Sequence, residues 1–97
     1  MKKVNIYQLK DGRTREYGFM TYKWALAHGF NLDDYELVAE MYNDDEREDE
    51  RILDRVWLFG NDGTYQKSFK MRSVSVSDII EIDGTKYYVD SFGFKEI

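Results

Sequence analysis

The chain has 97 residues, of which 42% are hydrophobic and 16% aromatic, and its formal net charge is −5. This length predicts a single domain over residues 1–97, and so many aromatic residues exclude a disordered chain. The absence of cysteine excludes disulfides and thiolate chemistry, and apolar runs of at most four residues exclude a transmembrane helix and a signal-peptide core, so we expect a cytoplasmic protein.

The first third of the chain predicts a strand followed by a short helix. Lys3–Leu9 alternates and is rich in β-forming residues, which predicts a strand. Arg13–Met20 is interpreted as an extended segment, because a glycine interrupts its apolar residues. Thr21 can cap a helix over Tyr22–His28, and the glycine that follows this helix is typical of a helix end.

The middle of the chain predicts a second strand and a longer helix. The alternation in Tyr35–Tyr42 favours a half-buried strand, although helix propensity allows a helix there. One face of this strand would carry Tyr35, Leu37, Ala39 and Met41. After an acidic run, a stripe at helical spacing predicts a helix over Glu46–Phe59 with Trp57 substantially buried. The stripe consists of Ile52, Leu53, Val56 and Trp57.

The last third of the chain predicts a loop and a hairpin. Tyr65 and Phe69 would anchor a loop over Thr64–Arg72. Asp83-Gly84 lies between two β-rich runs, Asp78–Ile82 and Thr85–Asp90, and predicts a hairpin. Near the end of the chain, two rings around Gly93 would anchor the terminus in the core; they are Phe92 and Phe94. The order of elements predicts an α+β domain, a small, mainly antiparallel sheet with two helices packed on it.

Charge is unevenly distributed along the sequence. Residues 33–54 have a net charge of −9, and the remaining residues have +4. The acidic run is either a solvated segment that keeps the protein soluble or a surface that binds a basic protein partner by resembling the phosphates of nucleic acid. The candidate acidic surface consists of Asp44, Asp45, Glu48, Asp49 and Glu50. Direct binding of nucleic acid is disfavoured, because basic residues are scattered apart from Lys67, Lys70 and Arg72.

The sequence contains no motif for catalysis or for a cofactor. His28 is the only histidine and lies at a predicted helix end, where a capping or surface role is favoured. Neither a nucleophile elbow nor a phosphate-binding loop is present, and the acidic run lacks the pattern of a calcium loop. We therefore predict no catalytic residue, no metal site and no cofactor.

A second candidate surface combines hydroxyl groups with one aromatic ring. Strict alternation in Ser73–Ser77 predicts a strand at the sheet edge or leading into the hairpin. Its hydroxyl groups would either satisfy local backbone or form a row that receives a partner. The candidate patch consists of Ser73, Ser75, Ser77, Asp78, Asp90 and Phe92.

Four short stretches resemble the YodL-like domain family. They are Ile6–Leu9, Tyr35–Val38, Ser73–Asp78 and Tyr88–Phe94, and the last two carry most of the resemblance. The acidic run and the Gly60–Lys70 connection depart from the usual family spacing. The resemblance implies a small bacterial domain typical of Firmicutes, found alone and within large proteins of mobile elements, without established catalytic residues.

These observations favour a non-enzymatic protein-interaction module of a bacterial mobile element or its host. Binding would use an exposed sheet edge, an aromatic patch or the acidic region. The alternative is an acidic inhibitor of host defence, of the anti-restriction or anti-CRISPR type, that mimics nucleic acid. A small hydrolase or nucleotide-binding enzyme is less favoured, because it would need convergent carboxylates in a pocket.

Overall fold

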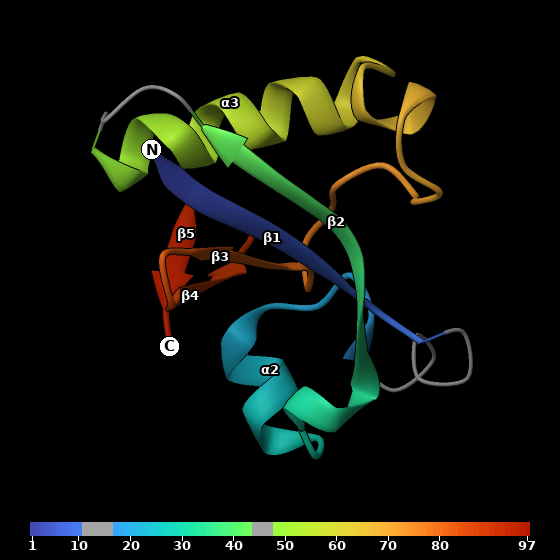
Figure 1. Ribbon diagram of the computed structural model, residues 1–97. Helices are drawn as coiled ribbons and strands as arrows, with labels where there is room; N and C mark the ends of the chain where they lie inside the picture. Colours follow the sequence, from blue (N-terminus) through green and yellow to red (C-terminus); the bar gives the residue numbers. More distant parts are fainter. Residues whose placement is uncertain (11–16, 44–47) are drawn as a thin grey trace.

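The structure, a computed structural model, describes residues 1–10, 17–43 and 48–97 (Figure 1). Five antiparallel strands form one sheet in the order β2-β1-β3-β4-β5. The strands are β1 (Lys2–Leu9), β2 (Tyr35–Asn43), β3 (Ile79–Ile82), β4 (Thr85–Val89) and β5 (Phe94–Glu96). The helices are α2 (Tyr22–Ala27) and α3 (Asp49–Asn61), with short 3₁₀ helices at Leu32–Asp34 and Tyr65–Lys67. The predicted α+β class, with an antiparallel sheet and two helices, is confirmed.

The two helices cover opposite faces of the sheet, so that the domain has three layers (Figure 1). On one face, Val4 and Ile6 of β1 pack with buried residues of α3. On the other face, Leu9 packs with Ala25 of α2 and with Tyr88 of β4. Strand β1, which lies between β2 and β3, therefore has buried residues on both faces and joins the two cores.

A β-bulge at Val38 moves the two ends of β2 to different cores. Ile6 pairs with Ala39 and Tyr7 pairs with Leu37, so Val38 has no partner on β1. Ala39 belongs to the α3 core, whereas Tyr35 belongs to the α2 core. The predicted single face with Tyr35, Leu37, Ala39 and Met41 is wrong, because one extra residue inverts the alternation.

Helix α3 begins and ends slightly later than predicted, and Trp57 is not in the core. Residues 46 and 47 of the predicted helix lie outside the described residues. The buried stripe consists of Ile52, Leu53, Val56 and Gly60. Trp57 is 42% exposed, because it follows Val56 by one residue and lies about 100° around the helix at the rim of the stripe. The prediction that Trp57 is substantially buried is wrong.

The C-terminal hairpin agrees with its sequence pattern. Asp83 and Gly84 have φ angles of 47° and 90°, as a two-residue turn requires. Phe94 packs against the α3 core, but Phe92 is 97% exposed, so it does not anchor the terminus. The loop after α3 is also as predicted, since Tyr65 and Phe69 pack against the same core.

Two segments predicted to be extended have other conformations. Ser73–Ser77 is irregular and ends in a turn, because the Ser77 backbone has a φ of 87°. Of the predicted extended segment Arg13–Met20, residues 13–16 lie outside the described residues. The rest forms a turn in which the Met20 N–H donates to the Tyr17 carbonyl.

The short helix α2 has the predicted cap. The Thr21 hydroxyl accepts a hydrogen bond from the Trp24 N–H at 3.2 Å. The helix ends at Ala27, one residue earlier than predicted, and the next glycine, Gly29, has a φ of 86°. In the described part of the chain, no helix combines the length and apolar character needed to cross a membrane.

Candidate functional site

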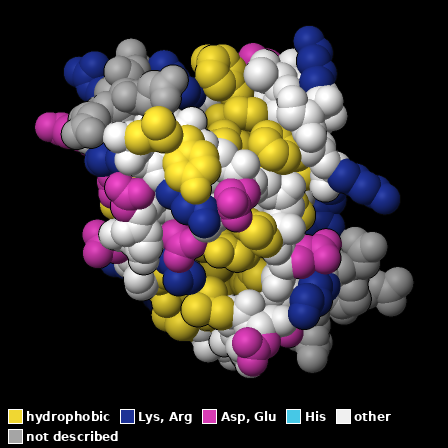
Figure 2. Space-filling view, in the orientation of Figure 1, with side chains coloured by type: hydrophobic (Ala, Val, Ile, Leu, Met, Phe, Trp, Pro, Cys, Tyr) yellow, Lys and Arg dark blue, Asp and Glu magenta, His cyan; other side chains and the backbone are white. Residues whose placement is uncertain are grey.

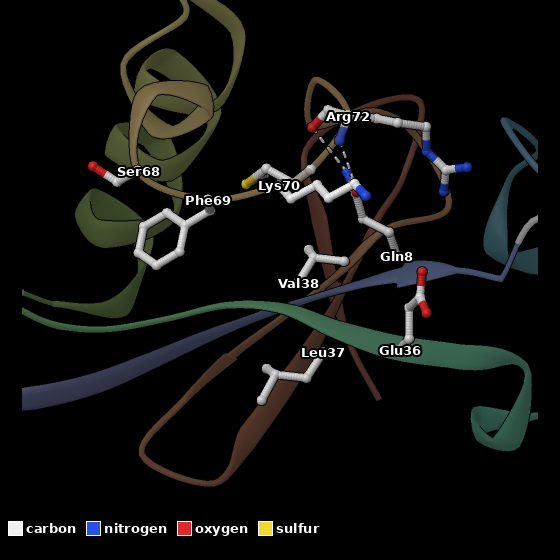
Figure 3. Close-up of a pocket in the computed structure, with 9 residues that line it drawn as sticks. Gln8, Glu36, Leu37, Val38, Ser68, Phe69, Lys70 and Arg72 are labelled. Carbon is white, nitrogen blue, oxygen red and sulfur yellow. Dashed lines mark hydrogen bonds between the residues drawn. The ribbon is translucent and has the colours of Figure 1, made fainter.

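A groove of about 760 Å³ lies beside the edge strand β2 (Figure 3). We call it the β2 groove; it is lined by Gln8, Glu36, Leu37, Val38 and Ser68–Arg72. One wall is the β-bulge of β2, and the other is the segment that leads from α3 back to the sheet. The groove therefore borders a strand that pairs with β1 on one side and has no strand on its other side among the described residues.

Gln8 holds the outer wall of the β2 groove in place. Its side chain is buried, and its Nε2 donates to the Arg72 carbonyl oxygen and to Asp78 Oδ2, both at 3.1 Å. Its Oε1 accepts from the Arg72 N–H at 3.0 Å. The Arg72 guanidinium in turn donates to the Leu9 carbonyl at 2.9 Å. This network fixes the segment across the sheet and thereby shapes the outer wall of the groove.

Asp78 is a structural member of the same network. Its Oδ2 also accepts from the Ser75 N–H at 2.9 Å, and the residue is only 4% exposed. Burial raises the pKa of Asp78 to about 6, although the hydrogen bonds from Ser75 and Gln8 oppose that change. Asp78 was predicted as part of a surface patch, but its carboxylate points into the fold.

The serine row of the candidate patch is not formed. Ser77 is buried, its Oγ accepts from the Phe19 N–H at 3.0 Å, and its carbonyl accepts from the Tyr35 hydroxyl at 2.6 Å. Ser73 is exposed and Ser75 is half-buried. The three hydroxyl groups therefore do not share one exposed face, because Ser73–Ser77 does not form the strand that would have aligned them.

The remaining members of that patch lie on the turn between β4 and β5. The Asp90 N–H donates to the Gly93 carbonyl at 3.0 Å, and Asp90 Oδ1 accepts from the Ser91 N–H at 2.8 Å. Phe92 stands at the tip of this turn with 97% of its surface exposed. Asp90 and Phe92 are thus close together, while Asp78 is directed elsewhere.

The candidate acidic surface is divided by the structure. Asp44 and Asp45 lie outside the described residues, and Glu48 and Glu50 are exposed. Asp49 binds Lys2 Nζ at 3.0 Å through Oδ1 and accepts from the Tyr87 hydroxyl at 2.7 Å through Oδ2. Burial alone would raise the pKa of Asp49, but these two hydrogen bonds outweigh it and lower the pKa below its usual value. Asp49 therefore ties α3 to the sheet.

The lining of the β2 groove combines apolar and charged side chains. Val38 and Phe69 provide apolar side chains, whereas the Leu37 side chain points to the other side of β2 (Figure 3). Glu36 is the one carboxylate among the described residues that line the groove. Among the described residues, no group of three or more potential metal ligands is brought together. Hydrophobic side chains form several patches from the top to the bottom of the face seen in Figure 2, with acidic and basic side chains between and beside them.

Sequence reasoning missed the β2 groove. The one indication in the sequence was Gln8. It is a polar residue on the same face of β1 as Val4 and Ile6, and it is buried as they are. A buried glutamine must satisfy its amide, so it marks a place where another backbone segment approaches the sheet. The sequence did not show that the segment would be Ser68–Arg72, because the contact spans 64 residues.

Comparison with known proteins identifies one family. The family model of the YodL-like domain matches residues 3–97. The comparison with curated proteins gave no match, and the comparison with solved structures gave none either. Because the family model covers nearly the whole chain, the protein belongs to the YodL-like domain family.

Proposed function

We propose that this domain is a non-enzymatic protein-interaction module that binds an extended segment of a partner along the open edge of β2. The observation that carries the proposal is a nine-residue edge strand bordered by the β2 groove. The opposite edge strand, β5, has only three residues and offers a shorter template. An unpaired edge presents backbone N–H and C=O groups that a second chain can pair with.

The bulge at Val38 supports binding of a strand and side chains together. The bulge interrupts the regular hydrogen-bond pattern of β2 next to the β2 groove. A partner strand could therefore pair regularly with β2 only from Ala39 to Asn43. A partner strand paired there would continue past the groove, where Leu37 is 48% exposed. Main-chain pairing would supply affinity, and the groove would select the partner's side chains.

The experiment is affinity capture from a bacterial host lysate with matched variants. Leu37→Asp places a charge beside the groove, and Leu58→Asp places the same charge on α3, where Leu58 is 57% exposed. We expect the captured partner to fall at least tenfold, as estimated for a central apolar contact, with Leu37→Asp and to stay unchanged with Leu58→Asp. Thermal unfolding of both variants checks that each is folded.

A follow-up with the purified partner tests the mode of binding. Amide hydrogen exchange in Ala39–Asn43 should slow in the complex, because the outward N–H groups of β2 become hydrogen-bonded. Equal capture by wild type and Leu37→Asp, or exchange that slows only elsewhere, would mean that β2 is not the binding edge.

An acidic inhibitor of host defence is the second proposal, and the exposure of Glu48 and Glu50 favours it. Glu48 is the N-cap residue of α3 and Glu50 lies in its first turn, and both add to the negative charge of the preceding segment. The test replaces Asp44, Asp45, Glu48 and Glu50 by their amides and leaves Asp49, whose contacts are structural. Unchanged affinity for a basic partner at low salt would remove this proposal.

A hydrolase is the less favoured proposal, because the hollow that carries two carboxylates is small. Two carboxylates, those of Asp54 and Asp90, line one hollow, but its volume is about 230 Å³. Sites for small molecules usually have about 300–1,000 Å³. We also propose a cytoplasmic location, from the lack of cysteine and the short apolar runs of the sequence. The family resemblance implies a Firmicutes bacterium, in which the module belongs to a mobile element or to its host.

A further inference from the structure

A second hollow lies between α3 and the turn that joins β4 to β5. Its volume is about 230 Å³, and we call it the Trp57 hollow. Trp57 and Phe94 supply aromatic surface, and Asp54 and Asp90 supply carboxylates. Among the described residues that line it, two are acidic and none is basic. An aromatic surface with carboxylates at its rim is complementary to an organic cation.

The walls of the Trp57 hollow are a helix and a turn, and both carry exposed aromatic side chains. Trp57 is 42% exposed on a helix whose other face packs in the core. The opposite wall is the turn closed by the Asp90–Gly93 hydrogen bond, and Phe92 at its tip is 97% exposed. Exposed aromatic side chains next to a hollow are typical of the residues that contribute most to protein–protein binding.

We infer that the Trp57 hollow binds an arginine side chain of a protein partner. A guanidinium is planar, so it can stack on the Trp57 indole while its N–H groups donate to Asp54 and Asp90. The volume fits one side chain better than a larger ligand. The same helix already shows this kind of contact, since Arg55 Cζ lies 6.0 Å from the centre of the Phe59 ring.

This inference rests on the proposed role as a protein-interaction module but uses a surface separate from the β2 groove. The two sets of lining residues have no member in common. Leu37→Asp should therefore leave arginine binding unchanged. Failure of the arginine experiment would not affect the β2 proposal, and failure of the β2 experiment would not affect this one.

The experiment is a titration with the peptide acetyl-Gly-Arg-Gly-amide, followed by NMR of the two indole N–H groups. Trp24 is the internal control, because it is 43% exposed and lies on α2, away from the hollow. We expect a saturable shift of the Trp57 indole signal in the millimolar range and no matching shift for Trp24. The peptide with glutamine in place of arginine should give no saturable shift, because it carries no cation.

Two variants with the same change of charge test the assignment. Asp54→Asn should weaken peptide binding at least threefold, while Glu50→Gln, one turn earlier on the same exposed side of α3, should leave it unchanged. Both side chains are exposed, so both variants should fold, which the amide spectrum checks. Equal shifts of both indoles, equal binding of the glutamine peptide, or equal effects of the two variants would overturn the inference.

Discussion

At the scale of single residues, Asp78 shows how one buried carboxylate organises a wall of the candidate site. Its pKa is raised to about 6, whereas an unfolded chain has the usual value near 3.8. The folded protein therefore holds the proton more tightly, and the ionised form is the one that folding disfavours. The contribution of Asp78 to the free energy of unfolding is therefore largest at low pH, where its carboxyl is protonated, and it is lost as the pH rises towards 6.

The corresponding prediction compares wild type with Asp78→Asn between pH 4 and pH 7. The free energy of unfolding of wild type, relative to the variant, should fall by about 2–3 kcal/mol as the pH rises, since one pKa unit corresponds to about 1.4 kcal/mol. Urea denaturation at several pH values measures both free energies, and subtracting one from the other removes the contribution of Asp49, which is the same in both proteins. Two curves that run parallel over this range would contradict it.

At the scale of elements, the sequence predicted the strands and helices better than it predicted their faces. Alternation and helical spacing predicted β1, β2, α3 and the C-terminal hairpin with only small errors at their ends. The bulge at Val38 could not be foreseen, because it depends on how β2 pairs with β1. The exposure of Trp57 follows from a buried stripe that continues to Gly60, one residue beyond the predicted end of the helix.

Gly60 supplies the prediction at this scale. In most helix interiors, replacing glycine by alanine stabilises by about 0.5–1 kcal/mol. Here a Cβ would overlap Val74 Cγ2, so Gly60→Ala should lower the free energy of unfolding by about 1–3 kcal/mol. In a Val74→Ala background, which removes Cγ2 but keeps a Cβ at 3.0 Å, the same change should cost clearly less. Equal losses in both backgrounds, measured by urea denaturation, would show that the contact is not the cause.

At the scale of the whole molecule, the two cores share one sheet, and this predicts a single unfolding transition. β1 contributes side chains to both cores, so loss of one core exposes the strand that supports the other. Trp24 reports on the α2 layer and Trp57 on the α3 layer. In single-tryptophan variants, Trp24→Phe and Trp57→Phe, fluorescence should give unfolding curves of the same shape, each matching the circular dichroism curve of the same variant.

A substitution in the α2 core should therefore lower the midpoint of unfolding by the same amount whether it is reported by Trp24 or by Trp57. Tyr88→Phe removes a 2.7 Å hydrogen bond from the Tyr88 hydroxyl to the Met20 carbonyl. Loss of this bond should cost about 1 kcal/mol and lower the midpoint of thermal unfolding by about 4–8 °C in a domain of this size. The shift should be the same whether Trp24 or Trp57 is observed. A shift seen by Trp24 alone would show that the α2 layer unfolds by itself, and the exposed surfaces of α2 and α3 would then have to be treated as separate units.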